Sequence, residues 1–100
     1  MPFGVRFVAS DVPTVTLESD DASVLEQRLL DHFDPDRLGL PDLLGRLRDG
    51  AKDGHEMTID ERQAEAVFVA LGAGPDESGA FLPERLFALR TACEVYLQAG

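Results

Sequence analysis

The first residues of the chain alternate between apolar and polar positions. Phe3, Val5 and Phe7 fall on one side of an extended backbone, and this period of two predicts a strand over residues 3–9. A second β-forming run predicts another strand over 14–18, and the short connection favours an antiparallel hairpin. Because two strands alone are marginally stable in water, the hairpin must pack on helices, gain a third strand or pair with another chain.

Beyond the hairpin, apolar residues recur every three to four positions, which is typical of amphipathic helices. We expect helices over 20–33, over a segment from Leu40 to Ala51, from Thr58 to about Leu71, and over about 82–98. The expected apolar stripes are Ala22, Leu25, Leu29 and Phe33; Leu40, Leu43, Leu44, Leu47 and Ala51; Ile59, Ala66, Val67, Ala70 and Leu71; and Leu82, Leu86, Leu89, Cys93, Tyr96 and Leu97.

Signals for helix ends accompany these stripes. Thr58 followed by Glu61 three residues later predicts a capping box at the start of the third helix. Pro35 ends the first helix, since the residue before a proline avoids the α-helical region, and Gly72 begins a glycine-rich stop for the third.

The order of elements, strands first and helices afterwards, favours an α+β fold over an alternating α/β fold. We expect an N-terminal two-stranded antiparallel hairpin followed by about four helices packed around one core. A mostly α-helical domain with an ordered N-terminal arm is the alternative. At 100 residues, the chain is expected to form a single small domain over 1–100.

The charge is strongly negative and unevenly distributed. The net charge is −10, and residues 19–36 and 55–77 each hold six acids and one base, whereas 37–54 hold four bases and three acids. Such a chain repels phosphate and anionic membranes, so we expect no direct nucleic-acid or membrane binding. A basic protein partner fits this charge better.

The chain contains one cysteine, Cys93, which cannot form an internal disulfide or a multi-thiolate metal site. No apolar run approaches the roughly 20 residues that span a bilayer, and the N-terminus lacks the pattern of a signal peptide. We therefore expect a cytoplasmic protein. Eight arginines against one lysine, with no asparagine, suggest GC-rich coding and a bacterial source.

Candidate catalytic groups are few. His32 follows Asp31 and His55 precedes Glu56, but neighbouring residues on a helix do not share a face. Cys93 lies in an apolar stripe, where a thiol is inert. The segment after Asp49 lacks the ligand spacing of a calcium-binding loop. We predict no catalytic, metal or cofactor site; a small metal-dependent or acid–base enzyme would require His32 and His55 to converge with carboxylates in one pocket.

The third helix also carries apolar residues away from its stripe. Phe68 lies about 140° from the centre of that stripe on a helical wheel. Either another element packs over it, or it forms a partner surface with an acidic rim. Phe87 and Val95 of the last helix are likewise off their stripe. The candidate contact residues are Glu61, Glu65, Phe68 and Val69, together with Asp20 and Asp31 on the outer side of the first helix.

These observations predict a non-enzymatic protein-interaction or regulatory module that binds a basic protein partner. Small acidic bacterial immunity proteins, antitoxins and nucleic-acid mimics are analogous in size and charge. A dimeric structural module, in which the N-terminal strands pair across a two-fold axis, is an alternative.

Overall fold

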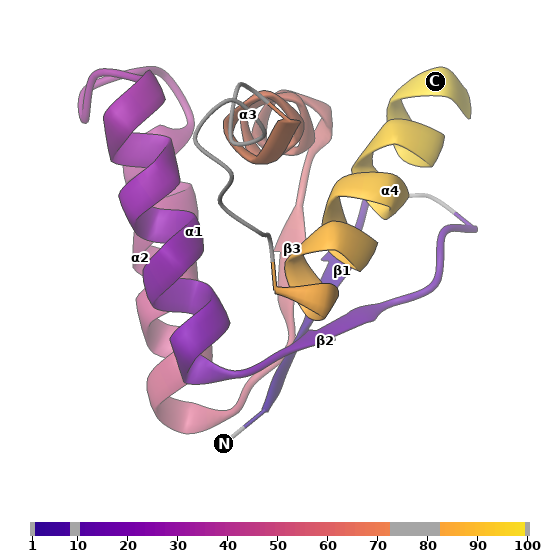
Figure 1. The fold of residues 1–100 in the computed structure, drawn as a ribbon, viewed down its shortest axis with the longest axis horizontal. Helices are drawn as coiled ribbons and strands as arrows, with labels where there is room; N and C mark the ends of the chain where they lie inside the picture. The colour runs from indigo at the N-terminus through magenta and orange to yellow at the C-terminus, as the bar shows by residue number, and fades with distance from the viewer. Residues whose placement is uncertain (1, 9–10, 73–82, 100) are drawn as a thin grey trace.

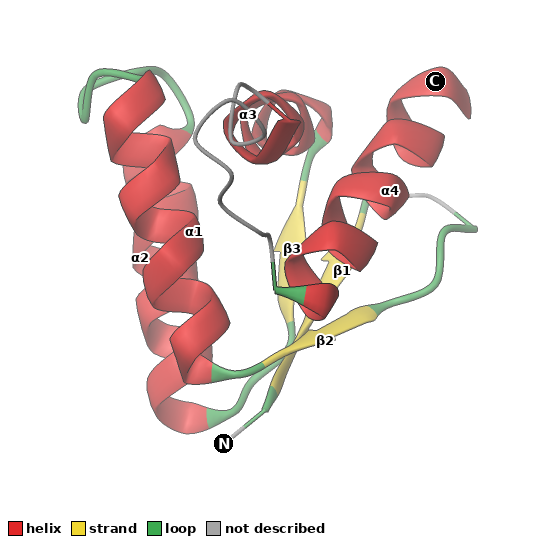
Figure 2. Cartoon of the chain, in the orientation of Figure 1, coloured by secondary structure: helices red, strands yellow, loops and turns green. Residues whose placement is uncertain are grey.

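A computed structural model describes residues 2–8, 11–72 and 83–99. It confirms the α+β class and the four expected helices, and it adds a third short strand that the sequence pattern did not predict (Figures 1 and 2). Ala9 and Leu82, which were expected at element ends, lie outside the described residues. The elements are β1 (Phe3–Phe7), β2 (Val15–Leu17), α1 (Ser19–His32), α2 (Leu40–Asp53), β3 (Met57–Ile59), α3 (Glu61–Gly72) and α4 (Glu84–Ala99).

The three strands form one sheet in the order β2-β1-β3. The β1–β2 pair is the predicted antiparallel hairpin, with Phe3 opposite Leu17. The β1–β3 pair is parallel, with Val5 opposite Met57, so its partners lie far apart in the sequence. The hairpin therefore gains its third strand from its own chain, and β1 becomes the central strand.

One face of the sheet supports the helices. Phe3, Val5 and Phe7 of β1 point to this face and are each 2% exposed. On the other face Arg6 is exposed and forms an ion pair with Glu56, with 3.3 Å between Nη1 and Oε1. The alternation predicted for this strand is thus realised as a buried apolar face and a solvent-facing polar face.

The helices cover the buried face in a connected layer. Helices α1 and α2 lie side by side and antiparallel, and α3 lies between α1 and α4 (Figure 1). Helix α4 also contacts β2, and the ring of its Tyr96 lies 5.2 Å from that of Phe7. This arrangement places all seven elements around one hydrophobic cluster.

The predicted apolar stripes form this cluster. Every stripe residue that the structure describes is buried in the cluster or packed against it. The cluster also includes Met57 of β3 and Ala64 of α3, which the stripes did not predict. Cys93 is fully buried there, and burial raises the pKa of its thiol to about 12.

The predicted capping box at Thr58 and Glu61 is wrong, because Thr58 belongs to β3. The reciprocal bonds form two residues later. The Gln63 backbone N–H donates to Asp60 Oδ1 at 2.9 Å, and the Asp60 backbone N–H donates to Gln63 Oε1 at 3.1 Å. The shift leaves Ile59 in a strand, where its side chain is 1% exposed.

Helix α2 approaches β1 closely at Gly50. A Cβ at this position would lie 2.8 Å from Phe3 Cδ2, so only glycine fits without movement of the Phe3 ring. Gly45, one and a half turns earlier, has no atom within 4 Å of the corresponding position. The buried Gly50 therefore sets the distance between α2 and the sheet.

Candidate functional site

The residues predicted on the outer face of α3 do not form one exposed patch. Glu61, Glu65 and Val69 are exposed, and Val69 retains 40% of its surface. Phe68 is half-buried and packs against the core, with the Arg90 guanidinium of α4 centred 5.2 Å from its ring. The last helix therefore covers Phe68, which was one of the two arrangements expected from the sequence.

The two acids predicted on α1 lie apart from these residues and from each other. Asp20 is in the first turn of α1 and Asp31 in its last turn, about 16 Å along the helix axis. Both are exposed, and Asp31 accepts a hydrogen bond from Gln27 Nε2 at 3.1 Å. Asp20 therefore cannot share a site with residues near the end of α1.

The structure instead brings the start of α3 against the loop between α1 and α2. A hollow of about 580 Å³, open to solvent, lies between them. We call it the acidic hollow, and its lining residues are Arg37, Asp60, Glu61, Arg62 and Glu65. Two of the predicted contact residues, Glu61 and Glu65, thus belong to a site whose other members the sequence did not indicate.

Local chemistry fixes the loop that forms one wall. Arg37 N–H donates to the Asp34 carbonyl at 3.0 Å, and Leu40 N–H donates to the Arg37 carbonyl at 2.9 Å. The Arg37 guanidinium is centred 4.5 Å from the Phe33 ring, a cation–π contact that orients it. Gly39 turns the chain into α2 with a φ of 87°, a conformation that favours glycine.

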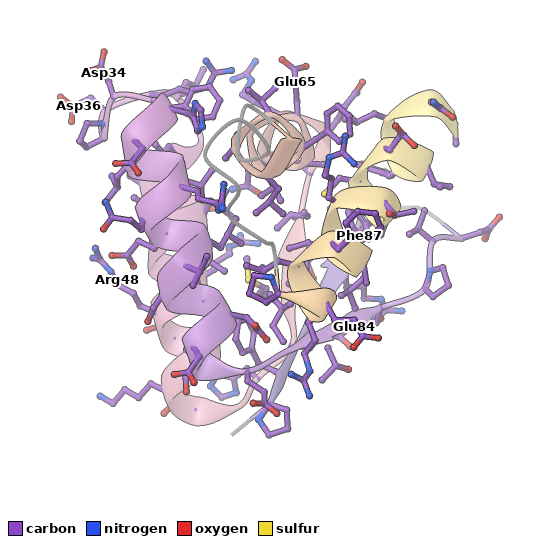
Figure 3. All side chains as sticks on the ribbon, in the orientation of Figure 1. Asp34, Asp36, Arg48, Glu65, Glu84 and Phe87 are labelled. Atoms are coloured by element: carbon purple, nitrogen blue, oxygen red, sulfur yellow. The ribbon has the colours of Figure 1, made fainter. Side chains whose placement is uncertain are left out.

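This loop exposes one leucine to an unusual degree. Leu38 is 72% exposed, the largest value among the large hydrophobic side chains described. Asp34 and Asp36 precede it in the loop, and they lie at the same end of the molecule as Glu65 (Figure 3). The sequence pattern gave Leu38 no role, because a single leucine between helical stripes has no periodicity to interpret.

A buried amide joins α3 to the end of the loop between α1 and α2. Gln63 is only 4% exposed, and its Nε2 donates to the Gly39 carbonyl at 3.2 Å and to Asp42 Oδ2 at 2.9 Å. Its Oε1 accepts from the Asp60 backbone, so both ends of the amide are satisfied. Gln63 therefore ties the first turn of α3 to the first turn of α2.

The same network reaches the edge of the sheet. The Arg46 side chain forms an ion pair with Asp42, with 3.2 Å between Nε and Oδ2, and its Nη1 donates to the Thr58 carbonyl of β3. This bond covers part of an outer strand edge that would otherwise present an unpaired carbonyl. The site thus rests on a connected set of polar contacts that includes α2, β3 and α3.

The two histidines do not converge. His32 ends α1 and His55 follows α2, and the antiparallel packing places these points at opposite ends of the helix pair (Figure 1). Both are exposed, and His55 Nε2 lies 3.4 Å from Asp53 Oδ2. Among the described residues, no group of three or more His, Cys, Asp or Glu side chains could hold a metal ion.

No known family model matches this chain, and comparisons with curated proteins and with solved structures also found no match. None of the helices in the described part of the chain is both long enough and apolar enough to cross a membrane.

Proposed function

We propose that this chain is a non-enzymatic protein-interaction module that binds a basic segment of a partner protein at the acidic hollow. The observation that carries the proposal is the exposure of Leu38, which directly follows the hollow-lining Arg37 in the loop. A leucine that is 72% exposed gains free energy when another apolar side chain covers it. Interfaces commonly place such an apolar anchor within a polar rim.

The rim indicates the chemistry of the partner. Asp60, Glu61 and Glu65 line the hollow, and Asp34 and Asp36 lie in the adjoining loop. This excess of carboxylates favours lysine and arginine side chains and increases the rate of encounter with a basic surface. The partner segment that fits best carries an apolar side chain flanked by basic residues.

The two arginines of the hollow add selectivity. Arg37 is oriented by the Phe33 ring, and the stem of Arg62 lies beside Gly39, 3.6 Å from where a Cβ would stand. Both side chains line the hollow together with the carboxylates of Asp60, Glu61 and Glu65. A partner that places a carboxylate between basic residues would match this mixed lining better than a uniformly basic peptide.

Site-specific photocrosslinking in the source cells tests the proposal. A benzophenone amino acid at position 38 is compared with the same group at the exposed position Gln27 on α1. We expect one dominant protein adduct from position 38, and its yield should fall as the salt concentration rises. The same adduct should not form from position 27. Equal adducts from both positions, or none from position 38, would contradict the proposal.

Charge reversal provides a matched control. Glu61→Lys with Glu65→Lys should abolish the adduct at position 38, because both side chains line the hollow. Asp20→Lys with Asp49→Lys changes the net charge equally at exposed sites outside the hollow. If the second pair reduces the adduct as much as the first, total charge is responsible and the hollow is not the binding site.

A further inference from the structure

A groove lies along the seam between α1 and α2, on the outer side of this helix pair. Figure 3 shows Arg48, one of its lining residues, on the side of the pair that faces away from α3 and α4. The groove is open to solvent and has a volume of about 330 Å³, which is at the lower end of the range for small-molecule sites. It shares no lining residue with the acidic hollow, so the two are separate sites.

The floor of the groove is apolar. Ala22 of α1 and Leu47 and Ala51 of α2 line it, and Leu47 and Ala22 belong to the core, with exposed fractions of 1% and 5%. The short side chains of the two alanines leave room that a larger residue would fill. An aliphatic group that lies on this floor is removed from water, which favours its binding.

The charge of the lining is positive, whereas the whole chain carries −10. Two bases, Arg48 and Lys52, and one acid, Glu26, line the groove. The acidic hollow has three acids and two bases, and a third hollow, between α2 and β3, has two acids, one arginine and one histidine. An anion is therefore attracted to the groove more than to either of the other two sites.

Lys52 supplies this positive charge. Arg48 and Glu26 neutralise each other through two hydrogen bonds, from Nε to Oε1 at 3.0 Å and from Nη2 to Oε2 at 3.1 Å. Within the described part of the chain, Lys52 has no ion-pair partner.

The aspartates close to Lys52 are directed elsewhere. Asp53 Oδ2 lies 3.4 Å from His55 Nε2, and Asp49 lines the third hollow. Asp20, in the first turn of α1, is exposed and is not among the residues that line the groove. The Lys52 ammonium therefore remains available to a negatively charged ligand.

Hydroxyl groups complete the polar end of the groove. Helices α1 and α2 are antiparallel, so Ser19 and Ser23 near the start of α1 lie at the same end of the groove as Lys52 near the end of α2. Ser23 Oγ donates to the Ser19 carbonyl at 3.3 Å, whereas Ser19 Oγ has no hydrogen-bond partner among the described residues. An ammonium and a free hydroxyl thus lie beside an apolar floor.

We propose that this groove binds a small monocarboxylate with an aliphatic chain. The carboxylate accepts hydrogen bonds from the Lys52 ammonium and the Ser19 hydroxyl, and the chain lies on the apolar floor. One uncompensated cation matches one negative charge, whereas a phosphate dianion would be repelled by Glu26 without a second free cation to offset it. Because the polar contacts are exposed, we expect a dissociation constant of about 1 mM.

A titration with sodium hexanoate, followed by two-dimensional ¹H–¹⁵N NMR, tests this proposal. Hexanoate should shift the backbone resonances of the groove residues saturably and leave those around the acidic hollow unchanged. Affinity should rise about twofold with each CH₂ group from butanoate to hexanoate, because the open groove covers one side of the chain. No saturable shift, or shifts centred on another part of the molecule, would overturn the proposal.

Hexan-1-ol and hexylammonium separate the effect of the head group from that of the chain. Hexan-1-ol has the same chain without the charge, and hexylammonium reverses the charge. Both should bind more weakly than hexanoate by about fivefold or more. Equal affinity for the alcohol and the carboxylate would show an apolar patch without anion recognition and would refute the proposal.

Lys52→Gln should weaken hexanoate binding by about fivefold, because it removes the charged donor. Arg28→Gln is the matched control, since it removes the same charge from a position on α1 that does not line the groove, and it should leave the affinity unchanged. An equal loss from both variants would mean that net charge alone governs binding, which contradicts the proposed site. Lys52 is exposed, so unchanged thermal melting should show that its variant remains folded.

Ala51→Leu tests the floor of the groove. The added carbon atoms should occupy the space of the ligand chain, so hexanoate should bind this variant no more tightly than butanoate does. A dependence on chain length that persists in the variant would argue against the proposed position of the ligand. Glu61→Lys with Glu65→Lys should leave hexanoate binding intact, and Lys52→Gln should leave the adduct at position 38 intact, so failures of the two proposals can be distinguished.

Discussion

The side-chain amide of the buried Gln63 donates a hydrogen bond of 2.9 Å to the carboxylate of Asp42, which itself is exposed at the surface. On the surface, Gln27 donates the same kind of bond to Asp31 at 3.1 Å. The carboxylate is exposed in both pairs and only the first glutamine is buried, so comparing the pairs measures what burial of the amide adds to this bond.

Gln63→Glu should destabilise the protein by about 3 kcal/mol at neutral pH, because it removes two donor bonds and places a second carboxylate beside Asp42. The bond from the Asp60 backbone survives, since a glutamate oxygen can still accept it. Urea denaturation followed by circular dichroism measures the loss, which should shrink as the pH falls and a carboxyl becomes protonated.

Gln27→Glu is the control for this substitution and should cost about 0.5 kcal/mol or less, as is usual for an exposed pair. An equal loss of stability from both substitutions would show that Gln63 does not act as a buried link between α2 and α3.

Substitution by alanine should have opposite effects on stability at the two glycines of α2, Gly45 and Gly50. Gly45→Ala should stabilise the protein by about 1 kcal/mol, because its Cβ meets no atom within 4 Å and alanine favours the helix. Gly50→Ala should destabilise it by about 1–2 kcal/mol, because the new Cβ would lie 2.8 Å from the Phe3 ring. Thermal melting of both variants checks the prediction, and stabilisation by Gly50→Ala would contradict the close packing of α2 on β1.

Two neighbouring residues of α3, Phe68 and Val69, should differ in how much their truncation destabilises the protein. Phe68→Ala should cost about 2 kcal/mol, since the half-buried ring packs on the core and beneath Arg90. Val69→Ala should stay within about 0.5 kcal/mol, because Val69 is 40% exposed and alanine is the better helix former. Chemical denaturation distinguishes the two, and equal effects would mean that α4 does not cover Phe68.

The buried thiol predicts a loss of stability in alkali. Burial raises the pKa of Cys93 to about 12, whereas a thiol in an unfolded chain titrates near about 8.5. The unfolded state therefore releases this proton first, and the stabilisation present below about pH 8.5 is lost as the pH rises toward 12. Burial also raises the pKa of Tyr96, as do the nearby carboxylates of Glu61 and Asp60. Its ionisation therefore lowers stability in alkali in the same direction.

Unfolding free energies measured from pH 8 to 11 check this dependence. Cys93→Ala should reduce the slope by up to about 1.4 kcal/mol per pH unit, whatever its effect on absolute stability. An unchanged slope would mean that the thiol is not buried in the native state.

The helices could be predicted from the sequence because their stabilising pattern is local. Leu25 and Leu29, or Leu43 and Leu47, are one turn apart, so a period of 3.6 residues reveals both the helix and its buried side. Strand β3 is different, because a run of three residues is too short to show an alternation of apolar and polar positions. It is also paired with a distant segment, since Met57 lies opposite Val5, 52 positions earlier. Thr58 was consequently assigned to a helix cap, and the Asp60–Gln63 box was missed.

The candidate site was predicted only in part for a similar reason. Glu61 and Glu65 were identified from their position on an outer helix face, but the loop residue Arg37 is placed beside them by tertiary packing alone. The sequence left open whether Phe68 is covered or exposed, because a helical wheel does not show which other element packs against the side of the helix that carries it.

The parallel pairing of β1 with β3 also constrains the order in which the chain can fold. Strand β1 can form its hairpin with β2 early in synthesis. Its other edge stays unpaired until β3, more than fifty residues later in the chain, has been synthesised. Such non-local pairing slows folding, and the growing chain presents an unpaired apolar strand until β3 emerges from the ribosome. The α1–α2 pair, built from local contacts, can form in this interval and bring β3 back beside β1.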